Sequence, residues 1–479
     1  MYATKKTVII NMLWRLAERC GAQGVSFVVS VILARLLLPE EYGIVSLITI
    51  FTAILNLFMD SGFKNALIQK EDADQIDYST VFYFNVLMGI LLWILMCLAA
   101  PWISRFYEKD YMTPYICTMS LTLILGGING VQTAVVARRM EFKRFFYATL
   151  GGTIISAVVG IWMAYRGFGV WALIAQKLTN QAIDTVILWF TVRWRPSLCF
   201  SLRRLKPMFT YGSKLLGSSL LNSLTSNLSS LIIGKVYSSD MLAYYDKGRR
   251  IPNLVVENLQ SAVQSVLFPV IAQRQGDKSE VKKILKTSYI TAAYCMFPCM
   301  MGIAVCAETI IRILYTENWI SMTPYLQMWC FIFSFYLLHT ADLQVIQAVG
   351  RSDIILKIEI IKQILTLVFI LAAIPFGVLA MLASMCAVTV ISLYINSVPN
   401  RELADYGFLE HIRDILPIFA LSTAMGAVTW LVGLLPLPEL PGLLLQIIVG
   451  AGFYIGGSWI LHLESFDYVL QMVRGVLQK

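Results

Sequence analysis

The sequence predicts an all-α polytopic membrane protein of about 14 transmembrane helices, made of two pseudo-symmetric six-helix bundles and two C-terminal helices. Three observations predict this fold class. The chain is 58% hydrophobic and only 14% charged, its mean hydropathy is +0.69, and a tetrapeptide recurs in both halves with its surroundings. A soluble protein of 479 residues does not need so much apolar surface, whereas helices in lipid do.

Fourteen apolar stretches are long enough to cross a bilayer, at about 20 residues per crossing. They span residues 12–37, 43–64, 80–103, 114–136, 146–165, 169–192, 209–236, 242–272, 285–306, 322–349, 354–374, 377–397, 414–434 and 442–462. The last two stretches follow the repeated part of the chain, so the choice between twelve and fourteen spans depends on them.

A repeated motif sets the register of the two bundles. Met-Thr-Pro-Tyr occupies residues 112–115 and again 322–325, and Gln132 and Gln344 stand at matching places farther on. An offset of about 210 residues corresponds to six helices with their loops, and six is even, so both copies enter the membrane in the same direction. An axis along the membrane normal is therefore expected. The predicted domains are 1–200 and 201–400 for the two bundles, and 401–479 for two extra helices and a cytoplasmic tail.

The loops between these spans alternate in charge, which predicts the orientation of the chain. The basic set includes 138–144, 193–206 and 274–286, whereas the set poor in Lys and Arg includes 39–41, 107–110 and 166–167. Because basic loops stay in the cytoplasm, both termini are expected there. The net charge of +9 is explained in the same way, and no nucleic-acid partner is expected.

The eighth span carries charges that a bilayer does not tolerate without a reason. Asp246, Lys247, Arg249 and Arg250 would break the charge rule as an outer loop, but the repeat matches 241–272 to the continuous second span and so predicts a helix. Residues at helical spacing then form one polar face, namely Asp246, Arg250, Asn253, Glu257, Gln260 and Gln264. Such a face is expected to line water or ligand; the alternative is an exposed loop with an internal Asp–Arg pair.

The seventh span has a polar seam with a spacing of four residues. The seam consists of Lys214, Ser218, Asn222, Ser226 and Ser230. We interpret Lys214 and Asn222 as candidate ligand contacts. The alternatives are small-residue helix packing with interhelical hydrogen bonds for the serines and snorkelling of Lys214 to the cytoplasmic surface.

The first span begins with two arginines one helical turn apart. If the helix enters the membrane near Val8, Arg15 and Arg19 lie roughly 10–16 Å deep, at 1.5 Å per residue. If the span starts at Cys20, both arginines flank the membrane.

Acidic and titratable residues in other spans are candidates for ion coupling. Asp60 closes the second span and stands one turn before Lys64, while His339 and Asp342 stand one turn apart in the tenth. The last two residues have the chemistry to carry a proton, although a His–Asp pair is more often structural. The nine cysteines lack metal-ligand spacing, and no phosphate loop, HExxH motif or Ser/His/Asp spacing rises above chance. Neither a metal, nor a cofactor, nor enzymatic activity is expected.

Three segments carry a resemblance to a known family. They are 34–43 (ARLLLPEEYG), 60–63 (DSGF) with 66–69 (ALIQ), and 193–198 (RWRPSL). They resemble the oligosaccharide flippases of bacterial polysaccharide biosynthesis, of the colanic and teichuronic acid exporter type. Those flippases share a superfamily with multidrug-and-toxin extruders and the lipid II flippase. The match is specific over about residues 30–85 and 190–200 and elsewhere rests on topology.

The resemblance implies a transporter in the bacterial inner membrane that flips an oligosaccharide repeat unit on a polyprenyl pyrophosphate to the outer leaflet by alternating access. It also implies cationic cavity residues on the first and eighth helices, here Arg15, Arg19, Arg249 and Arg250. Asn222, Asn253 and Glu257 would then contact the glycan, and a polysaccharide polymerase and glycosyltransferases are possible partners.

Two other functions fit parts of the sequence. An ion-coupled multidrug antiporter of the same fold would need an acidic, aromatic cavity, which the basic excess disfavours. A membrane glycosyltransferase or polymerase would need a sizeable outer loop or an acidic pair at a membrane edge, and the predicted outer loops are short.

Overall fold

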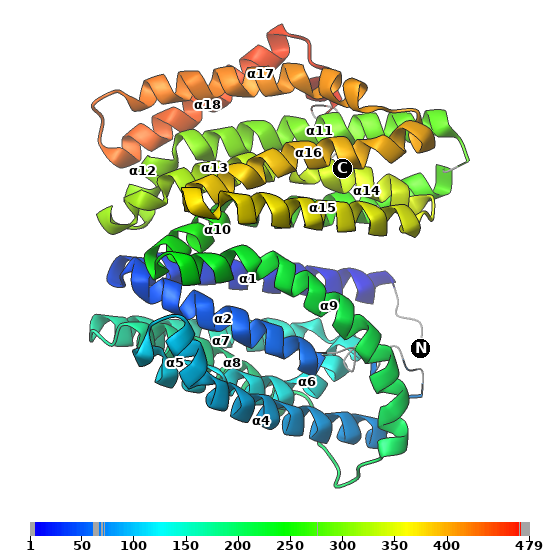
Figure 1. The fold of residues 1–479 in the computed structure, drawn as a ribbon. Coiled ribbons are helices and arrows are strands. Elements are labelled where there is room, and N and C mark those ends of the chain that lie inside the picture. The colour runs from blue at the N-terminus through cyan, green and yellow to red at the C-terminus, as the bar shows by residue number, and fades with distance from the viewer. Residues whose placement is uncertain are drawn as a thin grey trace. The chain divides into compact units, whose positions relative to one another are not determined.

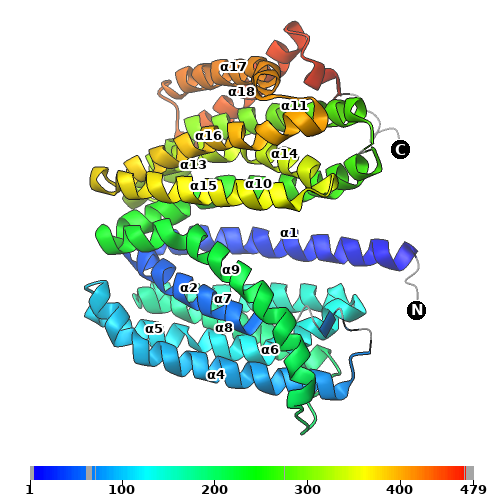
Figure 2. The same ribbon diagram turned by 45° about the vertical axis from the view of Figure 1, so that its right-hand side comes forward.

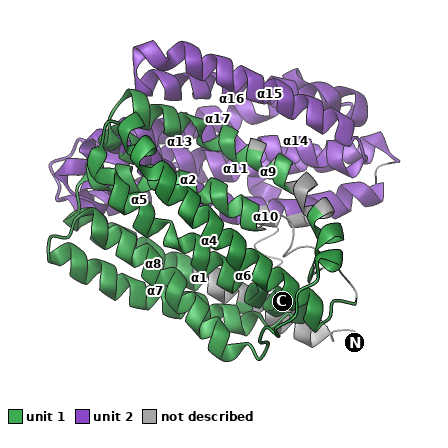
Figure 3. Ribbon diagram, turned by 60° about the horizontal axis from the view of Figure 1, so that its bottom comes forward, with its two compact units in different colours: residues 1–243 green, residues 244–479 purple. Residues whose placement is uncertain are grey.

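A computed structural model describes residues 5–60, 67–68, 70, 72–274, 276–468 and 470. All of the regular structure in this part of the chain is helical, as expected of a chain whose backbone groups must find partners within lipid. The chain forms two compact units, residues 1–243 and 244–479 (Figure 3). We describe each unit by itself.

The first unit holds the N-terminal helices (Figure 1). They are α1 (Lys5–Leu36), α2 (Pro39–Asp60), α4 (Gln75–Phe106), α5 (Thr113–Met119), α6 (Leu121–Arg139), α7 (Phe142–Tyr165), α8 (Val170–Thr191) and α9 (Leu202–Val236). Helix α10 (Ser239–Arg274) begins in this unit and continues into the second. Its 36 residues include Pro252 and Pro269.

The second unit holds the remaining helices. They are α11 (Lys278–Val305), α12 (Ala307–Leu314), α13 (Thr323–Ser334), α14 (Tyr336–Ala348), α15 (Ser352–Ala373), α16 (Val378–Ala404), α17 (Phe408–Gly433) and α18 (Glu439–Ile460). Figure 2 shows α17 and α18 as a pair beside α11. The two extra helices predicted after residue 400 are therefore present, and α17 packs on α11.

The predicted polytopic all-α fold is confirmed. Nine helical segments in the described residues have the length and apolar composition of membrane spans. Five more helices of at least 22 residues, α1, α8, α9, α10 and α15, accompany them. Each of the fourteen predicted spans coincides with one helix or with a pair of consecutive helices, α5 with α6 and α13 with α14.

The repeated tetrapeptide has the same local structure in both copies. Each copy ends a short 3-10 helix and starts an α-helix, with proline in the first turn. Met112 has φ −75° and ψ −20°, Met322 has φ −74° and ψ −18°, and both side chains are completely buried. Proline suits this position because its missing N–H would have no helical partner there. The repeat read from the sequence is thus a repeat of structure.

Helix α2 packs closely against the end of α9 and the start of α10. A Cβ atom added to Gly43 would lie 1.9 Å from the carbonyl oxygen of Ser239, and one added to Gly234 would lie 2.4 Å from the Leu47 side chain. Only glycine allows the backbones to approach so closely. This packing places α9 in the first compact unit. The predicted domain boundary near residue 200 marks where the second copy of the sequence repeat begins, which is a different criterion from packing. That boundary stays a prediction.

A cluster of charges joins the start of α4 to the start of α9. Asp74 caps α4 by accepting from the backbone N–H of Asp77, and its carboxylate lies 2.5 Å from Arg204 of α9. The buried Asp77 carboxylate lies 2.6 Å from Lys70. The Asp77 N–H, and next the Arg204 guanidinium, lower the pKa of Asp74 to about 2.

Candidate functional site: the polar face of helix α10 and the cavity of the second unit

Residues 246–250 lie in α10, so the prediction of a helix here is confirmed and the loop alternative is wrong. One side of the helix packs on α13, through Tyr245 and Gly248. Trp329 Nε1 donates to the carbonyl of Tyr245 over 3.2 Å, and a Cβ on Gly248 would lie 3.1 Å from the backbone nitrogen of Leu326. This packing fixes the rotation of α10 about its axis next to α13, and therefore where its charged residues lie.

Arg249 and Arg250 of α10 are exposed, whereas the neighbouring Lys247 is buried. Arg249 places its guanidinium 5.1 Å from the ring centroid of Trp329, a cation–π distance that leaves its N–H groups free to bind an anion. Lys247 is only 7% exposed and lies 6.0 Å from the ring of Trp319. Of the basic residues in this segment, Arg249 and Arg250 are therefore the ones accessible to a ligand.

Farther along the same face, polar side chains bond to one another. Asn253 Nδ2 donates to Glu257 Oε1 over 2.6 Å, one helical turn away. The bond holds the carboxylate on the helix surface and leaves its second oxygen for another donor. Next on this face come Gln260 and Gln264, and both line a cavity.

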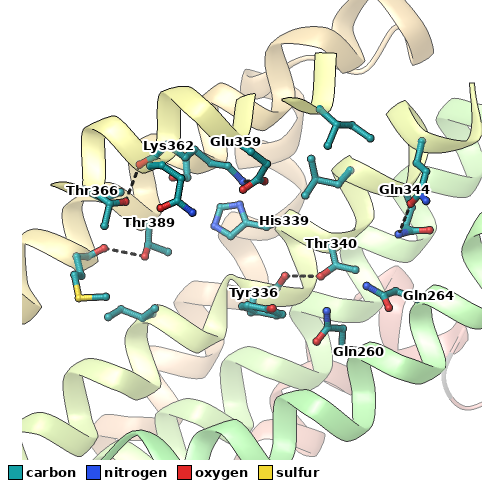
Figure 4. A pocket seen from close by; sticks show the side chains of 18 residues that line it. Gln260, Gln264, Tyr336, His339, Thr340, Gln344, Glu359, Lys362, Thr366 and Thr389 are labelled. Atoms are coloured by element: carbon teal, nitrogen blue, oxygen red, sulfur yellow. Dashed lines mark hydrogen bonds and ion pairs between the residues drawn. The ribbon is translucent and has the colours of Figure 1, made fainter. Parts of the chain in front are cut away.

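The cavity of about 520 Å³ lies among α10, α13, α14, α15 and α16 of the second unit. The residues that line it are mostly polar on α14 and α15, and both polar and apolar on α16. Figure 4 shows the His339 ring between Thr389 and the ion pair that Lys362 makes with Glu359 at 2.6 Å. His339 accepts a hydrogen bond at Nδ1 from Asn396 over 3.1 Å, and its buried Nε2 has no protein partner.

Asp342 lies one turn beyond His339 but in a different environment. It is completely buried, and it accepts hydrogen bonds from Asn400 Nδ2 at 2.8 Å and from the Tyr289 hydroxyl at 3.3 Å. His411, which stacks on Tyr289, approaches its carboxylate to 3.9 Å. His411 of α17 thus lies beside Asp342, whereas His339 lines the cavity.

The first unit has its own polar stripe, along α8. Lys177 is exposed and donates to Thr49 Oγ1 of α2 over 2.6 Å. Asp184, two turns farther on, accepts from Asn129 Nδ2 of α6 at 3.0 Å. Gln181 lies between them and donates to the carbonyl of Thr122 at 2.9 Å.

Five further predicted site residues belong to α1, α2 and α9. The side chains of Arg15, Arg19, Asp60 and Lys214 lie outside the part of the chain that the structure describes, although their backbones belong to α1, α2 and α9. Asn222 of α9 is exposed, and its carbonyl accepts a hydrogen bond from Ser226.

Sequence reasoning missed several ionisable residues within spans. They are Lys177 and Asp184 in α8, Glu359 and Lys362 in α15, and His411 at the start of α17. Each of the first four lies inside an apolar stretch, where a charge costs about 2.5–3.5 kcal/mol on insertion scales. Applying that cost to every span would have found them.

The arrangement offers groups that can bind a polar or anionic ligand. Exposed guanidinium groups can hold an anion, and amides and hydroxyls around the cavity can hold a polar, uncharged group. Within the described residues, no group of three His, Cys, Asp or Glu side chains is placed to hold a metal ion.

Comparison with known sequences identifies the relatives of this chain. The profile of a family described as "Polysaccharide biosynthesis protein" matches residues 32–324. The teichuronic acid biosynthesis protein TuaB of Bacillus subtilis (strain 168) is 23% identical over 80% of this chain and 80% of its own. The succinoglycan biosynthesis transport protein ExoT of Rhizobium meliloti (strain 1021) is 25% identical over 67% of this chain and 65% of its own. The lipopolysaccharide biosynthesis protein WzxC of Escherichia coli (strain K12) is 23% identical over 74% of this chain and 72% of its own.

Comparison with solved structures identifies the fold. The lipid II flippase MurJ in an inward closed conformation superposes with a TM-score of 0.72, covering 94% of this chain and 99% of that one. An inward-facing multidrug resistance transporter of the MATE family superposes with a TM-score of 0.59, covering 83% and 95%. Both are 14% identical to this chain. The fold is that of polytopic transporters, and the resemblance seen at residues 34–43 is confirmed.

Proposed function

We propose that this chain, which belongs to the polysaccharide biosynthesis protein family, transports polyprenyl-pyrophosphate-linked oligosaccharide repeat units across the bacterial cell membrane. The lipid-linked unit would move from the inner to the outer leaflet. Relatives named for teichuronic acid, succinoglycan and lipopolysaccharide biosynthesis support the class of cargo. The likeness to a lipid II flippase supports the class of transport.

The observation that carries the proposal is the pair of exposed arginines on α10. A pyrophosphate is a compact anion, and Arg249 and Arg250 offer permanently charged, forked donors to it. Arg15, Arg19 and Lys214 are proposed as further cationic contacts on helices α1 and α9. Asn222, Asn253 and Glu257 are proposed to contact the glycan, while the polyprenyl chain remains in lipid.

Transport would proceed by alternating access, with the binding residues open first to the cytoplasm and then to the outside. Both termini are proposed to lie in the cytoplasm, since the basic loops belong to that side. Asp60, His339 and Asp342 are the proposed candidates for coupling transport to an ion. No chemical reaction is assigned to the chain, and a polymerase and glycosyltransferases are proposed as partners rather than activities of it.

A multidrug antiporter of the same fold is the less favoured assignment, because the adjacent exposed arginines Arg249 and Arg250 suit an anion better than a cationic drug. The two functions can be separated by reconstitution. Purified protein in liposomes should expose a lipid-linked oligosaccharide in the opposite leaflet, measured with a glycan probe that does not cross membranes. Drug-driven ion movement without glycan exposure would overturn the proposal.

A further inference from the structure

The cavity of the second unit is lined by groups that suit a sugar. Five of its lining residues are glutamines from three helices: Gln260, Gln264, Gln344, Gln347 and Gln363. A glutamine amide both donates and accepts, so it can bond to adjacent hydroxyls that also do both. Its volume of about 520 Å³ falls within the about 300–1,000 Å³ typical of small-ligand sites.

Several of these groups have capacity left for a ligand. Among the described residues, the amides of Gln260, Gln264 and Gln363 make no hydrogen bond to protein. The buried Nε2 of His339 also has no partner in the structure. A polar group inside a protein is normally paired, so a cavity with this lining is built for a polar content.

One wall is aromatic, as a pyranose ring requires for its C–H face. Tyr336 lines the cavity and is 38% exposed, and Figure 4 shows it on the side of Gln260 and Thr340. A tyrosine offers an apolar ring with a polar tip. Together with the amides, it distinguishes a sugar from a drug-like apolar molecule.

The charges of the cavity indicate which sugar it takes. Lys362 is 2.6 Å from Glu359, so the pair is neutral as a whole. A uronic acid would bring a second carboxylate next to Glu359 with no unpaired cation to receive it, and an unpaired charge is costly in a site of low dielectric. A neutral hexose or N-acetylhexosamine avoids this cost.

The geometry therefore points to a subsite for one neutral sugar of the glycan, held by Gln260, Gln264 and Gln363 and stacked on Tyr336. This inference rests on the proposed function, because it assumes a glycan-bearing cargo. Arg250 and Gln260 are ten residues apart on α10, which is about 15 Å along a helix. A glycan of several sugars is thus needed to connect the arginines with the cavity.

The test compares binding of several polyprenyl-pyrophosphate lipids to the purified protein. One lipid carries no sugar, three carry a neutral trisaccharide of glucose, galactose or N-acetylglucosamine, and one ends in glucuronic acid. In the wild-type protein, at least one neutral trisaccharide should strengthen binding tenfold or more over the bare lipid, and glucuronic acid should weaken that gain.

Two variants and one control complete the design. Gln260→Leu with Gln264→Leu, and separately the cavity-filling Gln363→Trp, should remove the tenfold gain and leave binding of the bare lipid unchanged. Gln327→Leu is the control, because Gln327 is exposed and donates to the Ala304 carbonyl away from the cavity. Thermal unfolding identifies any variant that does not fold, and the other variant then decides.

The outcomes separate the two proposals. If both folded variants keep the gain, or if no neutral trisaccharide adds to binding of the bare lipid, the subsite is wrong while the transport function stands. If the wild-type protein neither binds nor translocates any of the lipids, the proposed function itself fails.

Discussion

Asn400 of α16 donates a hydrogen bond of 2.8 Å to the carboxylate of Asp342 of α14, in the interior of the second unit. Both side chains are completely buried, and His411 of α17 lies 3.9 Å from the same carboxylate. A buried acid held by neutral donors can take up a proton without losing its position. The approach of His411 to the same carboxylate brings the extra helix α17 next to the repeated part of the chain.

Replacing Asp342 should separate its structural role from a role in ion coupling. Asp342→Ala leaves the Tyr289 hydroxyl without its acceptor and leaves the Asn400 amide only the longer bonds to the backbone carbonyls of Asp342 and Asn396. The free energy of unfolding should therefore fall by about 1–3 kcal/mol. Asp342→Asn keeps an acceptor of the same shape and should unfold near the wild-type temperature, yet it cannot ionise. If Asp342 couples an ion, Asp342→Asn should lose transport in the leaflet assay. Full transport by this variant would exclude Asp342 as the coupling residue.

The adjacent exposed arginines Arg249 and Arg250 of α10 should control affinity for the pyrophosphate. Loss of a hydrogen bond to a charged group costs about 1.5–3 kcal/mol, so Arg249→Ala with Arg250→Ala should weaken binding of the bare lipid about tenfold or more. The matched control is Arg274→Ala at the end of α10, where the arginine pairs with Glu280 at 2.6 Å. Unchanged binding and delivery in the double variant would contradict the role given to these arginines.

The close approach of α2 to the start of α10 predicts an unusual response to alanine. Gly43→Ala would place a methyl group 1.9 Å from the Ser239 carbonyl, and overpacking of this kind costs about 1–3 kcal/mol. Gly24→Ala, in α1 with nothing within 4 Å, should instead gain up to about 1 kcal/mol from helix propensity. Unfolding in detergent measures both. Similar effects of the two substitutions would show that this contact is absent in the isolated protein.

Acid should weaken the junction between α4 and α9. The pKa of Asp74 is lowered from 3.8 to about 2 by the Asp77 N–H and by Arg204. An acid whose pKa is lower in the folded state than in the unfolded state stabilises the fold at pH values above its unfolded-state pKa. This contribution disappears as the pH falls through the folded-state pKa. Unfolding temperature should therefore fall between pH 3.8 and about 2. Asp74→Asn keeps the helix cap and should flatten this dependence; an identical acid profile would argue against the Asp74–Arg204 pair.

Periodicity and repetition predicted the helices well, because both depend on local order along the chain. The match of 241–272 to the second span predicted a continuous helix where hydropathy alone predicted a loop, and α10 is continuous. The same spacing put Gln260 and Gln264 on one polar face, and both line one cavity.

Partners from distant segments could not be predicted in this way. His339 and Asp342 share a helix turn, yet one faces the cavity and the other faces Tyr289 and Asn400, because α14 has packed helices on more than one side. Lys177 and Thr49 are 128 residues apart. Which side chains meet depends on the rotation of each helix about its axis, and hydropathy carries little information about that angle.

Pro252 gives α10 a weak point next to its cations. Proline has no backbone N–H, so the carbonyl four residues earlier, that of Gly248, lacks its usual helical donor. The helix is therefore held by one hydrogen bond fewer between Arg250 and the polar residues after Pro252, which lowers the cost of bending it there. The segment with Arg249 and Arg250 and the segment with Gln260 and Gln264 can therefore change the angle between them at little energetic cost.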